Sequence, residues 1–415
     1  MTERLYYHNS FLHDFVAALE DIRTLPDGRT ALVLDRTAFY PTSGGQVFDT
    51  GWLELEPLES ERGHFLPKLH VTEVAEEADG TILHVVDGEV PSGPIRVRGF
   101  IDVDRRRDHM QQHSGQHVLS TAFVELFGMP TVSFHMGAES CTIDLETKGL
   151  SAGQVRQAEQ RANQVILEDR EVSMRSVTPE EARALGLRKI PPAERDKLRL
   201  IDIRDFDLCA CGGTHVRSTG QVGALLIRKV EKVRQGVRVE FVCGERAVRH
   251  ARRDYETLTE AGALFSTHIW EVPAQIAKTL DETKAAAKVQ HKLLEEIAEL
   301  RAESLLHSTP DENGSRLVAQ VFSDRDMAFI KLLAQKLTRN AGVVTLLGAG
   351  AGQPALVFAQ SPGLPHDMGA LMKQSMTELG SRGGGTKDMA QGGVPDSARL
   401  HEAIAAAASR IRGGS

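Results

Sequence analysis

Two segments rich in metal-binding side chains, far apart in the sequence, constrain this chain more than any other feature. In HSGQH, His113 and His117 lie four residues apart, and in CGGTH, Cys211 and His215 have the same spacing. Side chains four apart share one face of a helix, and the glycine pair of the second segment allows a tight turn. Imidazole and thiolate together suit Zn²⁺. A fold that brings the two segments together would build a zinc site.

Neighbouring residues leave the exact ligand set open. His109 extends the first row of histidines, but at about 1.5 Å rise per residue it lies about 12 Å from His117 along the helix axis. One ion therefore takes either His109 and His113 or His113 and His117. Cys209 stands two residues before Cys211, and either thiolate can ligate while the other remains a spare thiol or supports a ligand. The alternative to a zinc site is a set of solvated histidines beside a buried thiol.

Composition excludes several classes of protein. Four cysteines in 415 residues are too few for a disulfide framework, and a clustered pair in a reducing cytosol more often binds metal or reacts. No apolar run approaches the roughly 20 residues of a membrane helix, and the N-terminus lacks a secretory signal, so we expect a cytoplasmic protein without a membrane span. A net charge of −8 argues against nonspecific coating of nucleic acid, although it allows a local basic face.

Hydrophobic patterns divide the chain into four parts. Residues 1–95 alternate short apolar runs with Gly and Pro, which is typical of a small β-barrel or sandwich. Residues 96–250 mix helical and strand patterns around both metal-binding segments. Residues 251–307 are helical in pattern, and residues 308–415 resume as α/β. The predicted fold is therefore α+β with several domains.

The helical part carries one apolar stripe. Its members are Val289, Leu293, Ile297 and Leu300. We expect the stripe to pack against neighbouring parts of the same chain, because it is too short and irregular to specify a partner. The alternative is a homodimer seam in this helix or in the part that follows it.

Three motifs together resemble a known family. HSGQH, CGGTHV and the upstream AFYPTSGGQVFDTGW resemble the editing domain of alanyl-tRNA synthetases and of the freestanding AlaX trans-editing proteins, and LGSRGGGTKDMAQGG resembles the glycine-rich signature of the DHHA1 domain. The order of these parts is similar to that of the long form of AlaX. The resemblance implies a glycine-rich β-barrel at 1–95, a zinc-binding editing core at 96–250, a helical linker at 251–307 and a DHHA1-like α/β domain at 308–415.

The resemblance also selects among the open alternatives. It implies that Cys209 is a bystander and that the zinc ligands are His113, His117, Cys211 and His215. A synthetase would carry an aminoacylation domain ahead of the barrel, and here the barrel pattern begins almost at Met1, so we expect the freestanding form. A phosphoesterase with a DHHA1 domain would need an Asp-His-His motif, which this chain does not match.

The implied reaction is hydrolysis of the ester that joins serine or glycine to the 3′ end of tRNA(Ala), with Zn²⁺ as cofactor. Such an editor is needed because a synthesis pocket cannot strongly reject an isostere that merely adds a hydroxyl. Four protein ligands would fill the coordination sphere, which is the pattern of structural zinc. Two other functions remain open: a tRNA-binding protein with structural zinc, and a zinc hydrolase of another ester or amide.

Four polar residues are candidates for the reaction pocket. Thr42, Ser43 and Gln46, in PTSGGQ, would line it and bond the serine hydroxyl, and the alternative is that this segment is only a tight turn. His135, in TVSFHMG, resembles a position where family members carry an active-site polar residue. It would orient water or the ester, unless it is a core histidine.

Binding of tRNA needs cationic surface, and affinity for phosphate then depends on salt. The candidates are Arg105, Arg106 and Arg107 before the histidine pair, Arg228, Lys229, Lys232 and Arg234 after CGGTH, and Arg382, Gly383, Gly384 and Lys387 in the tail. The resemblance implies that the tail contacts the body of the tRNA, and its backbone N–H groups would suit phosphate. The alternative for each patch is a solvated charged face.

Overall fold

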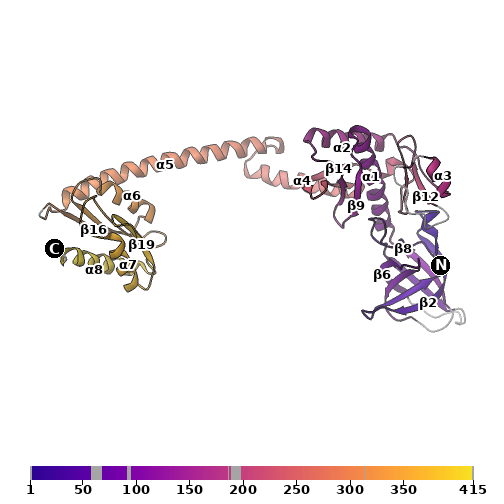
Figure 1. The fold of residues 1–415 in the computed structure, drawn as a ribbon, viewed down its shortest axis with the longest axis horizontal. Coiled ribbons are helices and arrows are strands. Elements are labelled where there is room, and N and C mark those ends of the chain that lie inside the picture. Colours follow the sequence, from indigo (N-terminus) through magenta and orange to yellow (C-terminus); the bar gives the residue numbers. More distant parts are fainter. Residues whose placement is uncertain are drawn as a thin grey trace. The chain divides into compact units, whose positions relative to one another are not determined.

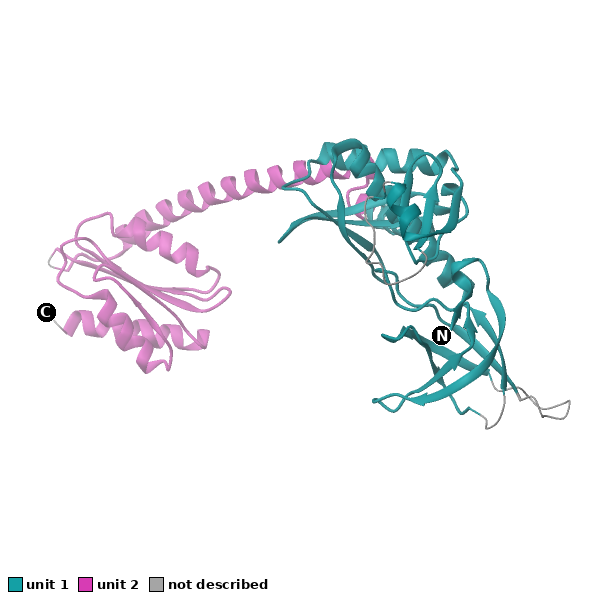
Figure 2. Cartoon of the chain, turned by 45° about the vertical axis from the view of Figure 1, so that its right-hand side comes forward, with its two compact units in different colours: residues 1–260 teal, residues 261–415 magenta. Residues whose placement is uncertain are grey.

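The computed structural model describes residues 2–57, 68–90, 95–185, 187, 198–312 and 314–413. They form two compact units, residues 1–260 and residues 261–415, which Figure 2 colours separately. Among the described residues, no helix is both long enough and apolar enough to span a membrane. The architecture confirms the expected mixture of α and β parts with a six-stranded barrel and a long helix.

The first part of unit 1 is a closed antiparallel barrel, drawn in indigo in Figure 1. Two of its strands alternate clearly between buried and more exposed residues, two others are buried along nearly their whole length, and the inward faces fill a common core. In hydrogen-bonded order they are β2 (Asp14–Thr24), β3 (Thr30–Leu34), β7 (Ile82–Asp87), β6 (Lys68–Glu76), β5 (Gly51–Pro57) and β8 (Ile95–Ile101). β8 runs past the predicted boundary at residue 95 because it pairs with both β2 and β5 and so closes the barrel.

Helix α1 (Val103–Phe127) is central to the second part of unit 1. Asp102 caps it by accepting a hydrogen bond from the backbone N–H of Arg105, and Gly128 ends it in the left-handed region at φ 64°. The helix packs against α2 (Ala152–Leu167) and against two sheets. These neighbours bury several of its polar side chains, His113 of the metal-binding segment among them, while His117 is partly buried.

The other elements of unit 1 surround this helix. One sheet has the order β14 (Leu225–Val233), β15 (Gly236–Cys243), β10 (Cys141–Leu145) and β9 (Thr131–Met136). The second has the order β11 (Val172–Val177), β12 (Leu198–Ile203) and β13 (Asp207–Ala210). The remaining elements are β1 (Glu3–Arg4), η1 (Leu5–Tyr7), β4 (Arg36–Thr37), α3 (Pro179–Ala184) and η2 (Thr219–Val222).

The predicted helical linker is two helices rather than one. α4 (Gly244–Leu264) ends shortly before Ser266, whose φ of 51° cannot continue a helix. A single turn, η3 (Ile269–Glu271), follows, and α5 (Val272–Ser308) then begins with a proline in its first turn.

Unit 2 contains a five-stranded sheet with a hydrophobic core on each face. Its strand order is β16 (Arg316–Phe322), β17 (Val343–Ala349), β18 (Ala355–Gln360), β20 (Met389–Gly393) and β19 (Gly383–Gly385). The helices that follow α5 are α6 (Met327–Leu337), α7 (Met368–Glu378), η4 (Ser397–Arg399) and α8 (Leu400–Gly413). The end of α5 and α6 share one core, and α7 and α8 share the other.

The face of α5 that packs in unit 2 is not the predicted stripe. Ala298 and Ala302 are buried against α6, with Leu294 and Leu305 beside them. The predicted stripe, in contrast, is exposed, from 42% at Ile297 to 67% for its last member. Small residues permit the close approach of two helices, which is why the alanine face packs and the larger side chains face outward.

Candidate metal centre

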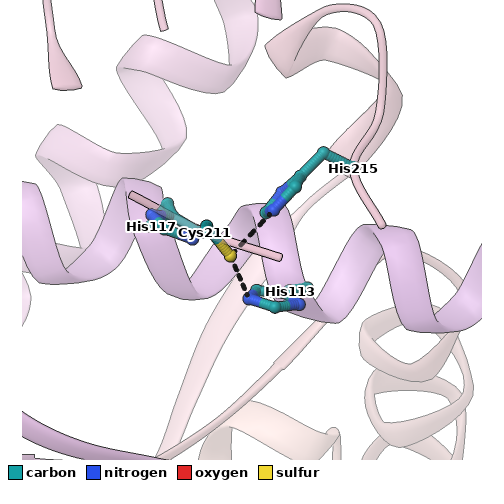
Figure 3. A group of neighbouring side chains, drawn as sticks. All are labelled: His113, His117, Cys211 and His215. Carbon is teal, nitrogen blue, oxygen red and sulfur yellow. Dashed lines mark hydrogen bonds between the residues drawn. The ribbon is translucent and has the colours of Figure 1, made fainter. Parts of the chain in front are cut away.

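The two metal-binding segments meet in unit 1. One comes from the middle of α1 and the other from the loop that follows β13, as Figure 3 shows. One potential ligand atom from each of four side chains lies within 4.8 Å of the others; these side chains, here called the Cys/His cluster, are His113, His117, Cys211 and His215. The sulfur of Cys211 lies 3.3 Å from Nε2 of His113 and 3.3 Å from Nε2 of His215. The predicted convergence of the two segments is therefore confirmed.

The donor atoms of the cluster fit a zinc ion. Nε2 of His117 is buried without a hydrogen-bond partner among the described residues, as expected of an atom that faces a metal. Burial raises the pKa of the Cys211 thiol, but the neighbouring imidazoles of His113 and His215 bring it well below its usual value, toward the thiolate. Burial lowers the pKa of His215 to about 3, so this ring is neutral and can ligate.

Each imidazole of the cluster is held from its Nδ1 side. Nδ1 of His113 lies 2.8 Å from Oε1 of Gln46, Nδ1 of His215 lies 3.2 Å from the hydroxyl of Ser114, and Nδ1 of His117 lies 3.2 Å from a carboxylate oxygen of Asp207. Because a carboxylate or amide oxygen can only accept, His113 and His117 donate from Nδ1. Their Nε2 atoms therefore face the cluster, an arrangement typical of metal-binding histidines.

The loop that carries Cys211 is shaped around the helix. A Cβ at Gly213 would lie 2.1 Å from Cε1 of His113, so no larger residue fits there without displacing the ring. Arg199 on β12 donates from one guanidinium nitrogen to the carbonyl oxygens of Cys211 and Gly213, both at 2.8 Å. These bonds hold the loop against the sheet. Ser114, Asp207 and Arg199 all act at this site, and sequence reasoning missed them.

The segment PTSGGQ forms the predicted tight turn, and Gln46 contacts the Cys/His cluster from it. Ser43 and Gln46 pair across a tight turn, and the two glycines between them have positive φ, as a two-residue hairpin turn requires. The turn also buries Gln46 completely, where its amide reaches both His113 and Thr214. The side chains of Thr42 and Ser43 are exposed on the same turn.

The structure separates the alternatives that spacing left open. His109 is buried, but its Nδ1 faces Asp49, with 3.9 Å between Nδ1 and Oδ1, and it is not part of the cluster. Cys209 lies 3.1 Å from Nδ1 of His117, on the side of the ring turned away from Nε2. With His117 and Asp207 it forms a second close group of potential ligands. Burial raises the pKa of the Cys209 thiol, which favours its neutral form.

Two predicted roles do not fit the positions observed. Arg106 is fully buried: its guanidinium forms an ion pair with Asp49, so it joins α1 to the barrel and cannot meet a tRNA phosphate. His135 is exposed on β9, and neighbouring strand residues point to opposite faces. The preceding residue, Phe134, packs against His113, with 5.3 Å between the two ring centroids. His135 is therefore turned away from the cluster, and it is not a core histidine either.

The other predicted tRNA contacts of unit 1 differ in whether their charge is already paired with a carboxylate. Arg228 forms a two-fold ion pair with Asp254, and Lys229 is paired with Glu231. Arg107 is exposed but paired with Asp104, with 2.7 Å between Nη2 and Oδ1. Lys232 and Arg234 are exposed and line a hollow on the surface, and the partly buried Arg105 lines another. The hairpin formed by β14 and β15 thus presents fewer free charges than its sequence indicates.

In the tail, close packing explains part of the glycine run. A Cβ at Gly383 would lie 2.7 Å from Met376 on α7, whereas one at Gly384 would meet nothing closer than 3.9 Å. The side chain of Arg382 is exposed and lines a cavity of about 450 Å³. Lys387 is also exposed.

Comparison with known proteins shows to which family this chain belongs. The family described as the threonyl and alanyl tRNA synthetase second additional domain matches residues 198–239, the segment that carries Cys211 and His215. The alanyl-tRNA editing protein AlaX-L of Pyrococcus horikoshii is 31% identical over 412 residues, which cover 95% of this chain and 95% of that protein. The chain belongs to the AlaX-L family of alanyl-tRNA editing proteins.

Relatives of this AlaX-L family member include much longer enzymes. The alanine–tRNA ligase of Archaeoglobus fulgidus is 32% identical over 402 residues, which cover 95% of this chain but 42% of the ligase. That of Natronomonas pharaonis is 33% identical, with 99% of this chain and 44% of the ligase covered. The chain thus spans less than half the length of the ligases it matches.

Proposed function

We propose that this protein is a zinc-dependent aminoacyl-tRNA deacylase that acts in trans in the cytoplasm and hydrolyses the ester of Ser-tRNA(Ala) and Gly-tRNA(Ala). The Cys/His cluster carries the proposal, because its donor set, its buried Nε2 and its Nδ1 partners suit zinc. Family membership over nearly the whole length of AlaX-L supports the substrate class.

The cluster would hold zinc through the Cys211 thiolate and the Nε2 atoms of its three histidines. A bound zinc ion supplies a Lewis acid and a positive anchor for the substrate. The chain's own residues set the geometry: Gln46 fixes the orientation of His113, and Asp207 fixes that of His117. Because Gln46 also bonds Thr214, the barrel turn and the loop of the cluster are tied at one point.

We assign selection of the amino acid to the tight turn that ends at Gln46. The side chains of Thr42 and Ser43 are exposed there and would bond the serine hydroxyl. Alanine lacks that hydroxyl and would forgo this hydrogen bond, which is worth about 0.5–1.5 kcal/mol. Glycine has no hydroxyl either, so its hydrolysis would depend on fit alone.

The tRNA itself would be held by cations on both units. In unit 1 we assign phosphate contacts to Arg105, Arg107, Lys232 and Arg234, and in unit 2 to Arg382 and Lys387. Arg107, Arg228 and Lys229 would contribute less, because each already has an acidic partner. A homodimer through α5 or unit 2 stays a prediction.

The test is deacylation of Ser-, Gly- and Ala-tRNA(Ala) by the purified protein, with bound zinc measured in parallel. We expect Ser- or Gly-tRNA(Ala) to be hydrolysed and Ala-tRNA(Ala) to be spared, and Cys211→Ala to lose both zinc and activity. Cys209→Ala is the matched control and should keep its zinc, because Cys209 lies on the far side of His117.

The alternatives give different outcomes in the same assay. A protein that binds tRNA and zinc but releases no amino acid from any of the three substrates would be a binding protein with structural zinc. Hydrolysis of simple esters or amides, without preference for an aminoacyl-tRNA, would make it a zinc hydrolase of another class.

A further inference from the structure

A cavity of about 480 Å³ lies in unit 1 at the first turns of α1. Its walls come from the start of α1, the barrel loop after Gln46, the turn between β9 and β10, and the first turns of α4. Its lining includes Phe48, His109, four arginines (Arg105, Arg107, Arg246 and Arg249) and three carboxylates (Asp104, Asp108 and Glu245).

Two segments link this cavity to the Cys/His cluster. Gln46 contacts His113, and the next two residues along the chain, Val47 and Phe48, line the cavity. On α1, His109 lines the cavity, and His113 is one turn further on, about 6 Å along the helix axis. The cavity is therefore the immediate neighbour of the cluster on the side of the N-terminus of α1.

The arginines of the cavity differ in whether a carboxylate already neutralises their charge. Arg246 is neutralised by Asp108, with 2.6 Å between Nη2 and Oδ2. Arg107 is paired with Asp104, with 2.7 Å between Nη2 and Oδ1. Arg249 lies 3.7 Å from Glu245, both side chains being 61% exposed, and such a pair is worth little. Arg105 has no carboxylate partner among the described residues. Two guanidinium groups are thus available to an anion that enters the cavity.

Arg105 is also held in a fixed position. Its Nε donates to the carbonyl oxygen of Phe48 at 3.0 Å, and its guanidinium lies over the Phe48 ring, 5.3 Å from the centroid. A planar guanidinium and an aromatic ring are the surfaces on which proteins stack unpaired bases, and they do so with little regard to sequence. The cavity thus offers a phosphate contact and a stacking surface side by side.

We propose that this cavity is a subsite for one nucleotide of the single-stranded 3′ end of the tRNA, in which Arg105 and Arg249 hold a phosphate and the Arg105–Phe48 pair receives its base. The inference rests on the proposed function, because that function places the terminal aminoacyl ester at the Cys/His cluster. A nucleotide in the adjoining cavity is one further back along the same strand. Arg249 and Phe48 thereby gain a role that their place in the sequence did not suggest.

The experiment measures binding of uncharged tRNA(Ala) to the full chain, so it does not depend on deacylation. Arg105→Gln/Arg249→Gln is compared with wild type and with Arg23→Gln/Arg29→Gln, which removes the same charge from exposed arginines of the β2–β3 hairpin. We expect the cavity variant to bind about tenfold more weakly and to lose about 0.7 from the slope of log affinity against log salt, the value for one phosphate of a single strand. The control should match wild type.

A second arm locates the phosphate. Each of the last phosphates before the 3′ end is replaced in turn by an uncharged methylphosphonate. At one position this change should weaken binding to wild type about tenfold. It should leave binding to the cavity variant unchanged, because that variant has already lost its contact with this phosphate. Equal losses for both proteins at every position, or an unchanged affinity of the cavity variant, would overturn the inference. If wild type binds in this way but does not deacylate, the proposed function fails and the subsite stands.

Discussion

Oε1 of Gln46 lies 2.8 Å from Nδ1 of His113 and accepts, in addition, a hydrogen bond of 3.1 Å from the backbone N–H of Thr214. The second bond fixes which end of the amide faces the ring, and the ring must therefore donate from Nδ1. A residue of the barrel thus sets the tautomer of a residue of α1, and the Nε2 lone pair of His113 faces Cys211.

Removal of this amide should weaken metal binding without removing a ligand. We expect Gln46→Ala to bind zinc 10–100-fold more weakly, the range found when the partner of a metal-binding histidine is lost. Competition with a chelating dye measures the affinity. Gln116→Ala is the control, because Gln116 is on α1 as well but bonds Ser120 instead of a cluster residue. Equal affinity of Gln46→Ala and wild type would mean that the barrel does not orient His113.

The two adjacent glycines of CGGTH should respond differently to alanine. A Cβ at Gly213 would lie 2.1 Å from the His113 ring, whereas one at Gly212 would lie 3.5 Å from the Tyr7 hydroxyl, an ordinary contact. We therefore expect Gly213→Ala to lose most of its bound zinc and Gly212→Ala to keep it. Metal analysis of the two purified variants decides this. Full zinc occupancy in Gly213→Ala would show that the loop can shift and that the observed geometry is not required.

The sequence predicted those features of the site that depend on local spacing. Four-residue spacing on a helix and a glycine-containing turn are local properties, so the histidine row around His113 and the segment CGGTH could be proposed as one metal site before any fold was known. The family resemblance was needed to choose between His109 and His117. The structure gives the physical reason for that choice: Asp49 of the barrel engages the His109 side of α1.

Residues that act through long-range contacts could not be predicted in this way. Arg106 stands between the partly buried Arg105 and the exposed Arg107, and no local pattern marks it as fully buried. Its partner Asp49 is in the barrel, and only the packing of the barrel on α1 brings the two together. Arg199 and Asp207 were missed for the same reason, because their partners belong to other segments.

Removal of one partner from the buried pair of Arg106 and Asp49 should strongly destabilise unit 1. Both side chains have no exposed surface, and Arg106 also donates to backbone oxygens of Ser10 and Ala38. Arg106→Met would leave the Asp49 carboxylate buried without its cation, which costs about 3–5 kcal/mol of unfolding free energy.

The measurement for this pair is urea unfolding followed by Trp52 fluorescence in a Trp270→Phe background, because Trp52 is on barrel strand β5 and Trp270 is in unit 2. Arg98→Met is the control: Arg98 pairs with Asp14 at 3.4 Å on the surface, and its loss should cost less than about 1 kcal/mol. Similar losses for the two variants would contradict the assignment.

The barrel should also lose stability in mild acid through His84 on β7. This histidine is fully buried between the Leu32 carbonyl oxygen and the Thr37 hydroxyl, and burial lowers its pKa to about 4. In the unfolded chain the pKa is about 6.5, so below that pH the unfolded state takes up the proton first and is favoured. The contribution of His84 to the unfolding free energy is complete above pH 6.5 and falls as the pH drops toward 4, by about 3 kcal/mol in all.

Urea unfolding of the barrel at several pH values, with the Trp52 readout, measures this slope. His84→Gln keeps a donor and an acceptor but does not titrate, and its unfolding free energy should change less over the same range. An identical slope in wild type and His84→Gln would assign the acid sensitivity to other groups.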